Sequence, residues 1–144
     1  MYIIKLVVNL TNRGVLMTGY VANIETVTLE NTNFRTVLYT GAHSQLVLMS
    51  LKPGEDIGME VHDNVDQFFR FEQGTAKVII NGEEQEVTSE WAVIVPAGAK
   101  HNVINTGDVD LKLYTVYSPA NHPDGTIHVT KEEAETYELE HHKE

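Results

Sequence analysis

The sequence predicts an all-β protein built as a single barrel or sandwich, and three observations support this class. Short runs of strand-forming residues follow one another closely, with turn residues between them. Asn81-Gly82 separates two of these runs and is typical of a two-residue hairpin turn, because both turn positions need a positive φ. The chain has 144 residues, which suits one domain with one core.

The expected elements follow in chain order. Residues 17–119 form the barrel, and residues 120–144 form a turn, a short helix and a polar tail. Thr130 and Glu133 have the spacing of a capping box, so the helix begins there and ends near residue 139. The expected strands are 24–29, 34–39, 45–51, 58–62, 67–71, 76–80, 84–87, 91–95, 101–105 and 111–117.

Residues 1–16 form an N-terminal extension with two open interpretations. Codons for Arg13-Gly14-Val15 can spell a purine-rich ribosome-binding sequence, which would make Met17 the biological start and residues 1–16 a leader. We favour the leader; the alternative is an additional strand, which their Ile and Val content supports. The apolar start is shorter than the ~20 residues of a spanning helix and has no clear cleavage site, so we expect a cytoplasmic protein.

Charge and composition exclude several function classes. The formal net charge is −11, which disfavours binding to nucleic acid and to anionic membranes. The chain has no cysteine, so it has neither disulfides nor a thiolate nucleophile or ligand. The partner that we expect is a small molecule, because the pocket residues named below would form a mostly apolar cavity with a few polar groups.

Two short segments hold the candidate site. The first reads G-x5-E-x-H-x4-Q-x6-G and contains Glu60, His62 and Gln67; the second reads P-x-G-x2-H-x3-N and contains His101. Residues two apart on a strand point to the same face, so Glu60 and His62 would converge with ligands from neighbouring strands.

Each ligand has a simpler alternative, and His62 and His101 could each be ordinary barrel residues. Glu60 could be a solvated rim carboxylate, and Gln67 could be a hydrogen-bonding strut, because a neutral amide is a weak ligand. Asp66 is the substitute carboxylate if the strand register shifts by one residue. Two histidines with one carboxylate and a weak oxygen suit Zn, Fe, Mn or Ni.

The spacing resembles the two-part motif of the cupin superfamily (cupin type 2), G-x5-H-x-H-x3,4-E-x6-G followed by G-x5-P-x-G-x2-H-x3-N. Every gap length matches, but Glu60, Gln67 and Glu90 replace the usual His, Glu and Gly. The resemblance implies a single jelly-roll β-barrel, a metal site inside it and a homodimer paired through sheet edges.

The pocket walls follow from strand parity. If Lys112 faces water, alternate residues of the last strand face inward, and Gln67 sets the same face for Phe69 and Phe71. For Val47, Met49 and Phe71, a role as plain core is favoured over a role in the pocket wall. The expected substrate-pocket residues are Gln45, Val47, Met49, Phe69, Leu113, Thr115 and Tyr117.

Three functions remain open. A sugar isomerase-like enzyme is favoured, with Glu60 as the catalytic carboxylate that moves a proton; the ligand inventory also resembles the zinc set of type I phosphomannose isomerases by composition. Recognition of phosphate is not expected, because Lys100 is the one basic residue that the motif places near the barrel mouth. The alternatives are a non-haem iron dioxygenase and a non-catalytic small-molecule binder or sensor.

Overall fold

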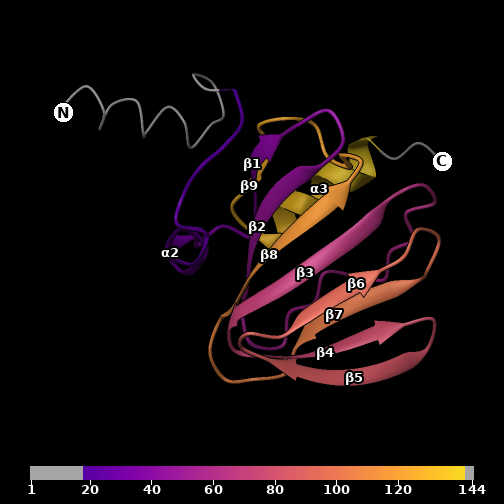
Figure 1. Cartoon of the computed structure of the whole chain (residues 1–144). Coiled ribbons are helices and arrows are strands. Elements are labelled where there is room, and N and C mark those ends of the chain that lie inside the picture. The colour runs from indigo at the N-terminus through magenta and orange to yellow at the C-terminus, as the bar shows by residue number, and fades with distance from the viewer. Residues whose placement is uncertain (1–17, 142–144) are drawn as a thin grey trace.

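Two antiparallel sheets face each other and enclose the core in a jelly roll, which confirms the predicted fold class (Figure 1). The computed structural model describes residues 18–141, so the interpretations of residues 1–16 and of Met17 lie outside the described part. The elements are α2 (Ile24–Glu30), β1 (Arg35–Thr40), β2 (Gln45–Leu51), β3 (Asp66–Gln73), β4 (Thr75–Ile80), β5 (Glu83–Thr88), β6 (Ala92–Val95), β7 (His101–Asn105), β8 (Leu111–Ser118), β9 (Ile127–His128) and α3 (Lys131–His141).

The larger sheet has six strands in the order β6-β3-β8-β2-β1-β9, and the smaller has three in the order β5-β4-β7. Strands β3, β8 and β2 form the centre of the larger sheet, and their inward residues are almost fully buried. The core comes from alternate residues of these strands and from β4 and β7 of the facing sheet. This burial is the main source of the folding free energy.

The prediction of a strand at residues 24–29 is wrong, because this segment is the helix α2. Asn23 caps it: its side-chain oxygen accepts a hydrogen bond from the Thr26 N–H at 3.0 Å. Glu25 adds a negative charge in the first turn, where the helix dipole favours one. Local capping therefore outweighs the strand preference of the β-branched residues in this segment.

Helix α2 also explains a second error, which concerns Lys112 on β8. Lys112 was expected to face water, yet it is 6% exposed, and its Nζ donates to the Asn31 carbonyl at 2.5 Å. Lys112 lies on the opposite side of β8 from the core residues Leu111 and Leu113, and Asn31 is the residue that ends α2. Side chains alternate between the two faces of β8 as expected. Both faces of this strand, however, are covered by other parts of the chain.

The hairpin at Asn81-Gly82 is confirmed, with φ of +49° and +85° between β4 and β5. The C-terminal helix is confirmed as well. The Glu133 N–H donates to Thr130 Oγ1, and Glu133 Oε1 accepts from the Val129 N–H, so the cap is reciprocal but displaced by one residue. Ala134 of α3 packs into the core. Among the helices of residues 18–141, none is long and apolar enough to cross a membrane.

Asn105 at the end of β7 joins three backbone segments. Its side-chain N–H groups donate to the carbonyls of Leu51 and Val109, both at 2.9 Å, and its oxygen accepts from the Gly107 N–H. It is 1% exposed, so water cannot replace these partners.

We expect Asn105→Ala to lower the free energy of unfolding by about 2–4 kcal/mol, because it leaves buried backbone groups unpaired. Urea denaturation measures this loss. Asn64→Ala, at an exposed turn position, is the control and should change stability by less than about 0.5 kcal/mol. Equal effects in the two variants would contradict the structural role of Asn105.

Candidate metal centre

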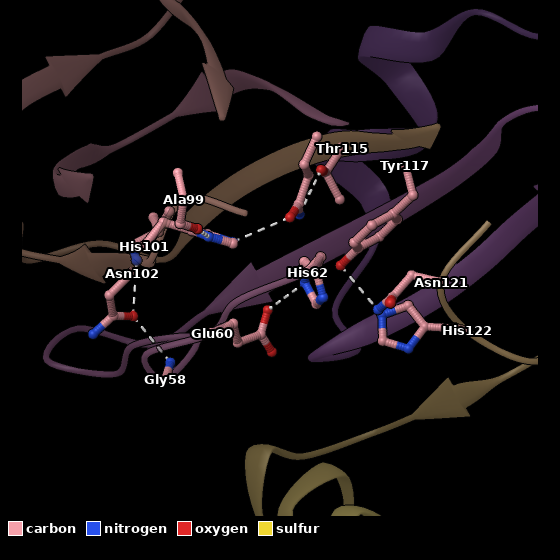
Figure 2. A network of polar contacts seen from close by, with 12 residues as sticks. Gly58, Glu60, His62, Ala99, His101, Asn102, Thr115, Tyr117, Asn121 and His122 are labelled. Atoms are coloured by element: carbon pink, nitrogen blue, oxygen red, sulfur yellow. Dashed lines mark hydrogen bonds and ion pairs between the residues drawn. The ribbon is translucent and has the colours of Figure 1, made fainter. Parts of the chain in front are cut away.

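The segment before β3 is not the continuous strand predicted at residues 58–62, but it is held against β7 by isolated bridges. Glu60 and His101 exchange two backbone hydrogen bonds of 2.8 and 2.9 Å, and the Gly98 N–H donates to the His62 carbonyl at 2.8 Å. Asn102 Oδ1 also accepts from the Gly58 N–H at 3.0 Å (Figure 2). These bonds fix the two motif segments beside each other.

Three potential ligands converge at this bridge. Glu60, His62 and His101 each offer one atom, and these atoms lie within 4.8 Å of one another. Figure 2 shows Glu60 and His62 pointing toward each other, with Oε1 and Nε2 3.1 Å apart. His101 is buried, whereas the side chains of His62 and Glu60 are 14% and 27% exposed, so the cluster is open on one side.

Gln67 joins the cluster from β3, and its hydrogen bonds fix which end of the amide faces His101. Thr115 Oγ1 donates to the Phe68 carbonyl at 2.8 Å and accepts from Gln67 Nε2 at 3.0 Å. Gln67 Oε1 therefore faces His101 Nε2, at 3.2 Å. His101 Nδ1 lies 3.1 Å from the Ala99 carbonyl, to which it donates. In the neutral ring Nε2 is then an acceptor, so two acceptors face each other.

A cation suits this arrangement of lone pairs. Two ligand atoms that are each about 2.1 Å from one ion lie roughly 3.0–3.4 Å apart, which matches the Gln67–His101 and Glu60–His62 separations. The carbonyl of Ala99 orients His101, as an outer hydrogen bond commonly does for a metal-bound histidine. The residues present therefore fit a divalent metal ion. Asp66 lies elsewhere, because its Oδ1 accepts from the Ala97 N–H.

Tyr117 and His122 extend the cluster toward the C-terminal segment. The ring centroids of His101 and His62 are 5.5 Å apart, those of His62 and Tyr117 5.8 Å, and those of Tyr117 and His122 5.1 Å. The Tyr117 hydroxyl lies 3.2 Å from His122 Nε2 (Figure 2). Sequence reasoning missed His122, because its Pro-Asp-Gly context indicates only a turn. Its position directly after the last long barrel strand was the one available signal.

Gln45 fixes the loop that carries His122. Its Oε1 accepts from the N–H groups of Asn121 and His122, at 3.1 and 3.0 Å, and its Nε2 donates to the His122 carbonyl at 2.7 Å. Gln45 is 1% exposed, so this loop is tied to the barrel interior. Gln45 was expected to line the pocket; in the structure it positions a residue beside the metal cluster.

Both Tyr117 and His122 are neutral at physiological pH. Burial, followed by the positive charge of Arg35, lowers the pKa of His122 from 6.5 to about 3. Burial and the negative charge of Glu60 raise the pKa of Tyr117 well above its usual value of 10.0. The pair is therefore a hydrogen-bonding unit that carries no charge.

The remaining expected pocket residues point inward and are buried. Val47, Met49, Phe69 and Leu113 belong to the apolar core, and Phe69 also contacts the His101 ring edge-on. Thr115 supports Gln67. Their role as substrate contacts stays a prediction, and the direct neighbours of the cluster among them are Phe69, Thr115 and Tyr117.

Comparison with known proteins shows the family. Residues 47–117 match the family described as Cupin domain. The chain is 51% identical over 121 residues to the uncharacterized protein YrkC of Bacillus subtilis. The aligned region covers 80% of this chain and 65% of the length of YrkC. The crystal structure of BH2720 from Bacillus halodurans is 46% identical, with a TM-score of 0.81, and the match covers 83% of this chain and 95% of that one. The chain belongs to the cupin superfamily, whose members often bind metal.

A more distant relative has a named activity. Mannose-1-phosphate guanylyltransferase of Salmonella montevideo is 35% identical over 80 residues, which is 56% of this chain and 17% of that enzyme. The similarity is therefore confined to a small part of the larger protein.

We expect His62→Ala and His101→Ala each to reduce bound divalent metal from one equivalent to less than about a tenth, because each removes a nitrogen ligand. Gln67→Ala should weaken binding much less, and Gln67→Glu should tighten it by adding charge. Elemental analysis and calorimetric titration measure these effects. His43→Ala, at an exposed position, is the matched control. Full metal content in both cluster variants would refute the site.

The low pKa of His122 predicts an acid-sensitive stability in metal-free protein. The unfolded chain takes up a proton on His122 below about pH 6.5, whereas the folded protein does so only near pH 3. The stability that the neutral, buried His122 retains is therefore complete above pH 6.5, and it is lost as the pH falls toward 3. The free energy of unfolding should rise with pH between pH 4 and 6. We expect His122→Gln to reduce the slope of this rise by up to about 1.4 kcal/mol per pH unit.

Urea denaturation at several pH values tests this slope. His43→Gln removes an exposed histidine and should leave the slope of the wild-type protein unchanged. An unchanged slope in His122→Gln would show that His122 is already solvated in the folded protein.

Proposed function

We propose that this cupin is a metal-dependent enzyme that acts on a small polar molecule through isomerase-like proton transfer. One observation carries the proposal: ligand atoms of Glu60, His62 and His101 lie within 4.8 Å of one another on the partly open side of the barrel, and Gln67 Oε1 faces His101 Nε2. A divalent ion bound there would act as a Lewis acid toward a carbonyl or hydroxyl oxygen of the substrate. Water, or that substrate oxygen, would complete the ligand set.

Glu60 has the position of the acid–base residue. Its Oε1 faces His62, while its Oε2 has no hydrogen-bond partner within residues 18–141. One oxygen can therefore serve the cluster while the other takes a proton from a substrate carbon and returns it to the neighbouring carbon. The partial exposure of the carboxylate leaves room for this contact.

Tyr117 would orient the substrate. Its hydroxyl lies at the buried end of the cluster and faces His122 Nε2. The high pKa keeps the proton on Tyr117, so the hydroxyl can donate a hydrogen bond to a substrate oxygen. The similarity to a small part of a mannose-1-phosphate guanylyltransferase agrees with a sugar-like substrate, although it does not extend to most of that enzyme.

A second function is favoured by the ligand types. Two histidines and one carboxylate with open positions are typical of non-haem iron oxygenases. In that case the cluster would bind Fe(II) and activate oxygen toward the substrate. A third possibility, a non-catalytic binder, would be favoured by purified protein that contains no metal.

Oxygen uptake separates the two enzyme classes. After anaerobic loading with Fe(II), we expect oxygen uptake with a panel of aldoses, ketoses and hydroxy acids to stay at the level without protein. In deuterated water, the isomerase predicts deuterium incorporation next to a carbonyl, detected by NMR. Glu60→Gln should lower this exchange at least about a hundredfold.

His43→Ala should exchange at the wild-type rate. Substrate-dependent oxygen uptake without deuterium exchange would replace the isomerase with the oxygenase. Metal-loaded protein with neither activity would leave the binder as the function.

A further inference from the structure

Arg35 of β1 is a buried guanidinium without an acidic partner. It is 3% exposed, and no carboxylate among residues 18–141 lies within ion-pair distance of it. Its Nη1 donates to His128 Nδ1 at 3.2 Å, and its Nε is buried without any hydrogen-bond partner. Arginine is rarely buried to this degree unless it is paired, because the cost of removing the charge from water is large.

Two other basic groups, the partly buried Arg70 and the buried Lys112, have oxygen partners. Arg70 lies 3.8 Å from the carboxylate of Glu72. Lys112 donates to the Asn31 carbonyl and lies on the opposite side of the larger sheet from the core. Arg35, in contrast, has neither a carboxylate nor a carbonyl oxygen beside it in the described chain; its guanidinium contacts His128 and lies over the Phe34 ring, 5.4 Å from the ring centroid.

The Arg35 side chain lies on the inner side of its strand. Arg35 and Val37 share one face of β1, and Val37 belongs to the core, whereas Thr36 and Leu38 line a groove on the outer face. Arg35 pairs across the sheet with Met49 on one side and with His128 on the other. It therefore lies inside the barrel, near the C-terminal segment that covers this end.

The charge of Arg35 acts on the residues beside the metal cluster. It lowers the pKa of His122, after burial, and it opposes the rise in the pKa of Tyr117. It also lowers the pKa of His128, again after burial. The positive charge of Arg35 therefore disfavours protonation of both His122 and His128. A neutral His128 that accepts from Arg35 on Nδ1 carries its proton on Nε2, where it is a further donor.

We propose that Arg35 binds the anionic group, a carboxylate or a phosphate, of the small molecule that reaches the metal cluster. A guanidinium matches such oxyanions with two parallel N–H donors, and it binds them tightly where water is excluded. The arrangement would place the anionic end of the ligand at Arg35 and its metal-binding oxygen at Glu60, His62 and His101. The second half of this assignment rests on the proposed function, whereas anion binding at Arg35 does not. Lys100, the basic residue that the motif places near the barrel mouth, is exposed, whereas Arg35 lies inside the barrel.

Thermal melting of metal-free protein tests the proposal with three variants. The probes are sodium phosphate and a set of carboxylates (acetate, glycolate and malonate), titrated at constant ionic strength against chloride. Arg35→Met removes the charge and keeps the volume. Lys112→Met removes a buried positive charge outside the barrel and is the matched control. Arg35→Lys keeps the charge and removes the fork of donors.

We expect a saturable rise in melting temperature of the wild-type protein with phosphate or with a carboxylate, because an anion that binds the folded state stabilises it. Whichever of the two probes gives the rise identifies the anionic group. Lys112→Met should respond like wild type, Arg35→Lys should bind at least about tenfold more weakly, and Arg35→Met should not respond. In chloride alone, Arg35→Met should melt at or above the wild-type temperature, because a buried charge without an acidic partner is removed.

Several results would overturn the proposal. These are a wild-type response no larger than that with chloride, an equal response in Arg35→Met, or unchanged affinity in Arg35→Lys. A lower melting temperature of Arg35→Met in chloride, together with no wild-type response, would assign Arg35 a purely structural role. If Arg35→Met does not fold, the affinity of Arg35→Lys for the anion tests the proposal on its own.

Metal content, measured after the same proteins are loaded with one equivalent of zinc, separates this proposal from the proposed function. Arg35→Met should keep the full metal content of wild type. Wild-type protein that binds the anion through Arg35 but takes up no metal would refute the metal centre and support the anion site.

Discussion

The backbone bridge between Glu60 and His101 is the contact on which the site depends. Two reciprocal hydrogen bonds join these residues, although neither a continuous strand nor a sheet surrounds Glu60. The bridge brings a carboxylate and an imidazole from segments about forty residues apart to within ligand distance. Asn102 and Gly98 add bonds on either side of it, through Gly58 and His62, and these make the placement rigid. If the bridge opened, Glu60 and His62 would be free to move away from His101.

The polar interior of the barrel is built to hold orientations. Phe68, Thr115 and Gln67 form a chain of hydrogen bonds in which each donor has one acceptor, and this chain ends on an oxygen that faces His101. A fully satisfied buried network favours one arrangement of its members. The last pair, Gln67 Oε1 and His101 Nε2, is the exception, and an ion is the simplest group that satisfies both. Arg35 is a second exception, because its buried Nε has no hydrogen-bond partner among residues 18–141. We propose a cation at the first exception and an anion at the second.

The sequence predicted the parts of this structure that follow from periodicity and turn chemistry. The Asn81-Gly82 hairpin, the burial of alternate residues in β3 and β8, and the capped C-terminal helix all depend on neighbouring residues. The motif spacing also identified Glu60, His62 and His101, because the gaps between ligands encode which strands lie side by side. The family and the jelly-roll fold followed from this spacing.

The errors come from contacts that sequence patterns do not encode. Residues 24–29 have strand composition, but the single Asn23 cap and packing on the larger sheet make them a helix. Lys112 obeys the alternation and is nevertheless buried by that helix. Arg35 and His122 were missed because their roles depend on long-range neighbours, Arg35 through His128 and His122 through Gln45. Such contacts appear only when the chain is folded.

Anomalous diffraction from a crystal loaded with one equivalent of zinc tests the central claim most directly. The account predicts a single strong peak bounded by Glu60, His62, Gln67 and His101, with His101 Nε2 and Gln67 Oε1 both at ligand distance. A peak at exposed histidines such as His43, or no peak at the Glu60–His101 bridge, would contradict it.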